Sequence, residues 1–199
     1  MTNNAHDRWL LISVSTAAGA GAGSLRVQVW RKLRSLGALY LQQSVCLLPA
    51  RDDVGREINR LSDRIRRQGG TVRVLSIAFT DPAEEQAVVA ELNATRDTEY
   101  AEVLDRLPEL RQELVTEQAR GNTTYAEVEE SQADLDRFRT WLGKIAARDY
   151  FSAPGGRAAH EAVEQAAAEL ATFEDAALHA DDTAPHGDTT PQLRAVEDS

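Results

Sequence analysis

Strand-forming segments are confined to the first 80 residues of this 199-residue chain. The runs WLLISVS (9–15) and TVRVLSIAF (71–79) are rich in Val, Leu and Ile, as buried or half-buried strands are. A third stretch, ALYLQQSVCLLPA (38–50), has two apolar runs around a polar centre, which predicts a hairpin that Pro49 ends. The chain can therefore build one small sheet of four strands, and all of it must come from this region.

Two helices are predicted between these strands. In the first, Leu25, Val29 and Leu33 share one face, Ser24 is placed to cap the start, and Gly37 is placed to end it. The second begins at residue 52 or 53, and its apolar face is formed by Val54, Ile58, Leu61 and Ile65. The order strand, helix, hairpin, helix, strand predicts an α+β fold. It matches a ferredoxin-like βαββαβ domain with an antiparallel sheet and two helices on one face.

From residue 81 onward the strand signals disappear, and Glu and Ala become frequent. Apolar residues recur at spacings of three and four in three segments, which predicts a helical hairpin or three-helix domain. Pro108 should kink the first of these helices or mark its start. We therefore expect a ferredoxin-like basic domain at 1–80, an acidic helical domain at 81–178 and a disordered acidic tail at 179–199.

The charge of the chain is divided unevenly between these regions. Residues 1–80 hold 12 Lys and Arg against 5 Asp and Glu, whereas residues 81–199 hold 10 against 27. The two parts therefore carry +7 and −17, within a formal net charge of −10. Such asymmetry is typical of a polyanion-binding module joined to a solubilising or partner-binding one.

The second helix carries the strongest positional signal. At 100° per residue, Arg56, Arg60, Arg64 and Arg67 fall within an arc of about 80° opposite the apolar face. Guanidinium groups are planar forks that suit phosphate oxygens, so these arginines predict contacts with the backbone of double-stranded DNA. The first helix adds four supporting cations, which are Arg26, Arg31, Lys32 and Arg34. The alternative is that all these residues pair with the acidic helical domain of the same chain or of a partner subunit.

Motifs for cofactors and metals are incomplete. The stretch GAGAG (19–23) follows a strand as a dinucleotide-binding loop does, but Ser24 stands where the third glycine is needed, so we interpret it as a flexible loop. His160 and Glu161 begin like a zinc-protease helix, yet Glu164 replaces the second histidine. We predict no catalytic, cofactor-binding or metal-binding residues, and a protein that is not an enzyme.

The cellular location is predicted from cysteine content and hydropathy. Cys46 is the single cysteine and lies in an apolar run, so we interpret it as a core residue. The apolar run at 9–14 is too short to span a membrane and lacks the features of a signal peptide. We expect a cytoplasmic protein that does not contact a membrane.

With these elements in order, the chain resembles the N-terminal region of the ChrB family, regulatory proteins of bacterial chromate-resistance operons. The resemblance is carried by WLLISVS, SVCLLP, RRQGGTVRVL, RDTEYAEVL, TYAEVEESQADLDRFRTWLGKI and ARDYF, and covers residues 8–178. It implies transcriptional control through DNA binding by this region, with chromate as the effector. Full-length members of the family carry a further C-terminal domain, where this chain has an acidic tail.

The sheet domain also resembles that of PaaX-type repressors and of the small CRISPR-adaptation nucleases. Those nucleases hold a metal-binding aspartate at the end of the first strand, where this chain has Ser13, Ser15 and Thr16. Three hypotheses follow: a ChrB-type DNA-binding regulator acting as a homodimer, a protein–protein interaction module whose helical stripes recruit a partner, and, ranked last, a metal-dependent nuclease.

Overall fold

The computed structural model describes residues 9–16, 22–120 and 125–182. Along the chain its elements are β1 (Trp9–Ser15), α1 (Ala22–Ser35), β2 (Leu39–Gln42), β3 (Val45–Pro49), α2 (Asp52–Arg67), β4 (Thr71–Ile77), α3 (Pro82–Arg120), α4 (Tyr125–Ala146) and α5 (Gly155–Asp182). In these residues the protein is α+β, with one four-stranded antiparallel sheet and five helices. The predicted α+β class, the four strands and the helices between and after them are confirmed.

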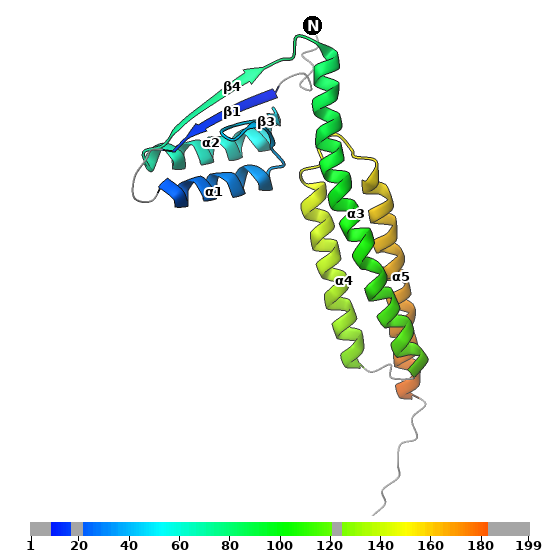
Figure 1. Cartoon of the computed structure of the whole chain (residues 1–199). Coiled ribbons are helices and arrows are strands. Elements are labelled where there is room, and N and C mark those ends of the chain that lie inside the picture. The colour runs from blue at the N-terminus through cyan, green and yellow to red at the C-terminus, as the bar shows by residue number, and fades with distance from the viewer. Residues whose placement is uncertain (1–8, 17–21, 121–124, 183–199) are drawn as a thin grey trace, which may run out of the picture.

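The sheet has the strand order β2-β3-β1-β4. β1 pairs with β4 over its full length and with β3 from Trp9 to Ser13. Helices α1 and α2 cover the same face of this sheet (Figure 1). Their apolar stripes form one core with alternate strand residues, among them Ile12, Cys46, Leu48 and Val72. The alternation in the strands and the 3.6-residue period in the helices therefore meet in one layer of side chains.

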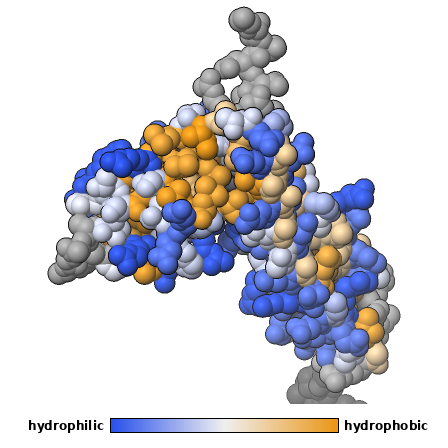
Figure 2. Space-filling view, turned by 45° about the horizontal axis from the view of Figure 1, so that its top comes forward, coloured by the Kyte–Doolittle hydropathy of each residue, from blue (hydrophilic) through white to orange (hydrophobic). Residues whose placement is uncertain are grey.

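The opposite face of the sheet is only partly covered. Trp9 lies there, with its ring stacked on Phe151 at 5.5 Å and edge-on to Phe79 at 5.6 Å. The first turns of α3 pack against the same cluster through Leu92. Beyond this contact the face stays open, since Leu41 and Leu75 are about half exposed. Figure 2 shows the resulting hydrophobic area over the sheet-containing part of the molecule.

Helices α3, α4 and α5 pack together along their lengths and extend away from the sheet (Figure 1). The three predicted stripes meet in one buried core, which contains Tyr100, Val103, Leu107, Leu135, Ile145, Val163, Leu170 and Phe173. Pro108 lies inside α3, which begins at Pro82, so the proposal that it marks the start of a helix is wrong. In the described residues no helix has the length and hydropathy needed to cross a membrane.

Two predicted boundaries differ from the structure. Ser24 is not a cap, because α1 already begins at Ala22 and the Ser24 hydroxyl instead accepts a hydrogen bond from the Gln28 amide at 3.1 Å. Helix α5 continues to Asp182, beyond the predicted start of the tail. The rest of that tail and most of the GAGAG stretch lie outside the described residues.

Candidate nucleic-acid interface

Helix α2 presents its arginines to solvent because its other side packs into the core. Val54, Ile58 and Ile65 are almost fully buried against the sheet. The residues on the opposite side are exposed, and these are Arg56, Arg60, Arg64 and Arg67, as predicted. Acids occupy the first turn and arginines the last turn, an arrangement that complements the helix dipole. The positive charge is therefore concentrated toward the C-terminal end of α2.

Glu57 neutralises part of this surface. Its carboxylate lies 2.5 Å from the Lys32 ammonium of α1 and 2.5 Å from the Arg60 guanidinium of its own helix. The hydrogen bond from Lys32 is the largest of the effects that lower the pKa of Glu57, and the charge of Lys32 and the contact with Arg60 add to it. Both cations therefore face an acid inside the sheet domain, and the Lys32 contact also ties α1 to α2.

Two cations of α1 are used elsewhere. The Arg34 guanidinium lies over the Trp30 ring, 5.0 Å from its centroid. The Arg26 Nε atom is 3.4 Å from the Thr16 hydroxyl. Helical phase alone does not show which neighbour a long side chain meets, so these two contacts could not be predicted from the sequence.

The remaining cations form what we call the basic face, which consists of Arg31, Arg56, Arg64 and Arg67. All four are exposed, and within the described part of the chain the structure shows no ion pair for any of them. Arg31 lies about 200° around α1 from the buried Val29, on the solvent side of the helical layer that also contains α2. These four residues have the exposure and charge that phosphate contacts require.

The acidic helical domain does not cover the basic face. Its own ion pairs are internal where the structure describes them, as between Arg111 and Glu169 or between Arg139 and Asp136. The bundle projects from the sheet end of α3, away from α1 and α2 (Figure 1). The sheet domain and the acidic helical domain are therefore in contact, but the acids of the bundle do not neutralise the basic face.

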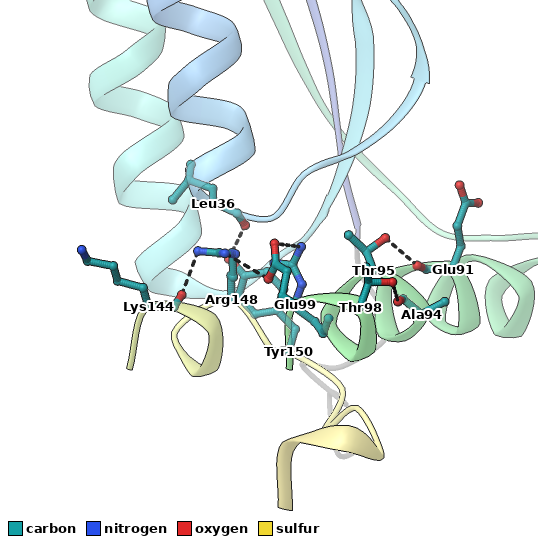
Figure 3. A network of polar contacts seen from close by, with 10 residues as sticks. Leu36, Glu91, Ala94, Thr95, Thr98, Glu99, Lys144, Arg148 and Tyr150 are labelled. Carbon is teal, nitrogen blue, oxygen red and sulfur yellow. Dashed lines mark hydrogen bonds and ion pairs between the residues drawn. The ribbon is translucent and has the colours of Figure 1, made fainter. Parts of the chain in front are cut away.

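They are attached through the tetrapeptide RDYF (148–151), in the connection between α4 and α5. Arg148 forms an ion pair with Glu99 of α3 at 2.9 Å, and the Tyr150 hydroxyl donates to the Leu36 carbonyl at 2.7 Å (Figure 3). Asp149 accepts a hydrogen bond from the Tyr100 hydroxyl at 3.1 Å. This segment therefore connects the end of α1 to the bundle.

Glu99 also pairs with Arg96 at 3.1 Å, and the Arg96 side chain is only 7% exposed. Burial lowers the pKa of Arg96. Gly37, the residue after Leu36, has a φ of +71°, and an added Cβ would lie 3.0 Å from Arg148 Cβ and 3.2 Å from Arg96 Nη1. The ARDYF motif is visible in the sequence. The junction is not, because the residues that this motif contacts are far away along the chain.

No metal centre is formed by the described residues, among which no group of three or more His, Cys, Asp and Glu side chains is placed to hold an ion. Cys46 is buried in the core between the sheet and the two helices, as predicted. Ser13 and Ser15 lie at the end of β1, which closes with Ser15.

Comparison with known proteins shows the family to which the chain belongs. Residues 26–184 match the family described as "Protein ChrB, N-terminal". Protein ChrB of Cupriavidus metallidurans is 31% identical over 106 residues, which are 53% of this chain and 32% of that protein. The chain thus matches about one third of the length of that relative. No solved structure matches the chain. The matched span begins within α1 and includes the basic face, the rest of the sheet domain after β1 and the helical bundle, and the chain therefore belongs to the ChrB family through its N-terminal region.

Proposed function

We propose that the protein is a cytoplasmic DNA-binding transcriptional regulator of the ChrB type that controls a chromate-resistance or related stress operon. The basic face carries this proposal. A chain with a net charge of −10 has four exposed arginines on one side of one layer, with no acid of the described residues paired to them. Keeping like charges together costs stability, so a phosphate backbone is the natural counterpart.

The architecture supports the same function. The strand order β2-β3-β1-β4, with both helices on one face, is compatible with the ferredoxin-like module expected from the sequence. Arg31, Arg56, Arg64 and Arg67 would anchor phosphates of double-stranded DNA, which fixes position without reading sequence. Arg60 and Lys32 would contribute less because each already faces Glu57. Chromate as the effector rests on the family alone.

The interaction-module alternative loses its main support. It needed helical stripes free to recruit a partner, yet most residues of those stripes are buried against one another within the bundle. It also needed the arginines to be satisfied internally, and four of them have no paired acid in the described part. Nothing among the described residues favours the metal-dependent nuclease.

A homodimer is part of the proposal. The open apolar area of the sheet includes the half-exposed Leu41 and Leu75, and a second copy would cover it. A two-fold dimer would place two basic faces on one operator, as palindromic sites require. Sedimentation velocity should show a dimer that Leu75→Glu converts to a monomer. A monomeric wild-type protein at micromolar concentration would contradict this part of the proposal.

The direct test is fluorescence anisotropy with labelled duplex DNA from upstream of the gene and with a scrambled duplex, at several salt concentrations. Replacing Arg31, Arg56, Arg64 and Arg67 together with alanine should weaken binding to both duplexes. It should reduce the log–log salt slope by about 3 to 4, because each phosphate contact contributes about 0.9. Adding chromate tests whether it releases the DNA.

The matched control replaces Arg137 and Arg139, which lie on α4 and pair with Asp134 and Asp136. This variant should keep the wild-type affinity and slope. Equal affinity in the fourfold variant and the wild-type protein would remove the basic face from the interface. No binding at all at low salt would return the interaction-module alternative to first place.

A further inference from the structure

A cavity of about 580 Å³ opens between α1, the end of β1 and the β2–β3 hairpin. It falls within the usual size range of small-molecule sites. It lies on the side of α1 where Arg26 contacts the Thr16 hydroxyl and Arg34 lies over the Trp30 ring. The residues that line it are Ser13, Val14, Ser15, Thr16, Arg26, Val27, Val29, Trp30, Leu33, Tyr40, Gln43, Ser44 and Cys46.

The interior of this cavity is apolar and aromatic. Val29, Leu33 and Cys46 are buried core residues that contribute to its wall. Trp30 and Val27 are each 45% exposed, an unusual state for large apolar side chains on a helix that packs on a sheet. The cavity therefore offers a surface that an apolar ring can cover.

One polar group inside this wall lacks a partner. The Tyr40 hydroxyl is buried, and no hydrogen-bond partner for it is present among the described residues. Burial raises the pKa of Tyr40 to about 12, so the hydroxyl keeps its proton and can donate it. A buried hydroxyl without a partner is costly, but this hydroxyl lies behind the cavity surface, so a ligand oxygen reaches it only if the Tyr40 side chain turns.

The charge of the lining is positive. Among the described residues it includes the Arg26 guanidinium and no acid, in a chain where acids outnumber bases by 32 to 22. The Arg34 guanidinium over the Trp30 ring adds a second cation beside the lining residues. An anion is therefore favoured over a neutral or cationic ligand of the same shape.

We propose that this cavity binds a small aromatic carboxylate, with its ring against Trp30 and the Val29–Leu33 wall and its carboxylate at Arg26. This site is separate from the basic face, so the proposal does not depend on DNA binding.

The test uses 2-naphthoate as the probe and the indole N–H resonances of the ¹⁵N-labelled full chain. The protein has three tryptophans, which are Trp9, Trp30 and Trp141, and Trp30→Phe assigns the relevant signal. Titration should move the Trp30 resonance saturably and leave those of Trp9 and Trp141 in place. Neutral 2-naphthamide and acetate, which each lack one half of the recognised chemistry, should bind at least about tenfold more weakly.

Three variants sharpen this test. Arg26→Ala and Ser44→Glu remove a cation from the lining or add an acid to it, and both should weaken 2-naphthoate binding by about tenfold without touching the core. Val115→Ser, an exposed position on α3 far from the cavity, should bind the probe as the wild type does. The proposal is overturned if the Trp30 resonance shows no saturable shift, if Arg26→Ala and Ser44→Glu bind as the wild type does, or if Val115→Ser abolishes binding.

Discussion

Replacing Glu57 with Gln should increase DNA affinity, which makes it a stricter test than any loss of function. Glu57 holds both Lys32 and Arg60 at 2.5 Å and lies next to the basic face on α2. Glutamine keeps the size of the side chain and removes its charge. A variant that has unfolded cannot bind DNA more tightly, so a gain in affinity cannot be an artefact of instability.

The size of the gain follows from the number of cations released. Lys32 and Arg60 are each bound to one carboxylate oxygen in the wild type, so the substitution frees at most two new phosphate contacts. One contact increases the salt slope by about 0.9, which corresponds to about eightfold in affinity at 0.1 M salt. The variant should therefore bind about 8 to 60 times more tightly, for specific and scrambled duplexes alike.

The assay is anisotropy with both duplexes between 0.05 and 0.3 M salt, values chosen to span the range in which such slopes are about linear. The control is Asp136→Asn, which removes the same charge from α4, where Asp136 pairs with Arg139. The control should change affinity little. If Glu57→Gln and Asp136→Asn have the same slope and affinity as the wild type, the α1–α2 surface does not meet the phosphates.

Further predictions concern the junction and the core. Gly37→Ala should destabilise the protein by about 1 to 3 kcal/mol in urea unfolding, since φ is +71° and the new Cβ would meet Arg148. Gly55→Ala, in α2 with open space around it, should instead stabilise by about 0.5 to 1 kcal/mol, and equal effects of the two substitutions would refute this account. Burial raises the pKa of the Cys46 thiol from 9.0 to about 12, so its contribution to stability is complete below pH 9 and is lost as the pH rises toward 12. Mass spectrometry after iodoacetamide at pH 9 should find Cys46 unmodified in native protein and alkylated in urea, and rapid native alkylation would contradict this.

The elements of this fold could be predicted because each depends on a local pattern. A short apolar run predicted β1, alternating apolar residues predicted β4, and the stripe from Val54 to Ile65 predicted α2 with its arginines on the outside. The start of α1 was predicted less well, because Ser24 is a favourable cap residue but the helix already begins at Ala22. A compositional change at residue 81 also concealed that α3 packs on the sheet through Leu92 before it enters the bundle.

The candidate site was predicted only in part, for the same physical reason. Helical phase places Arg56, Arg64 and Arg67 on one exposed side, since 100° per residue is a property of the backbone. It does not show that Glu57 reaches Lys32 of another helix, or that Arg34 lies on Trp30. Those contacts join residues on different elements or depend on rotamers. Only the folded structure therefore shows which cations have no ion pair among the described residues.

Sequence by itself determined the strands, the helices, the charge division and the outward row of arginines, because periodicity and composition act through neighbours along the chain. Tertiary structure alone decided three features. These are the RDYF junction that keeps the acidic bundle clear of the basic face, the open apolar face of the sheet and the cavity beside α1. Each depends on which segments distant in sequence approach one another in space. Hydrophobic packing is short-range and non-directional, so it determines these neighbours only when the whole chain has folded.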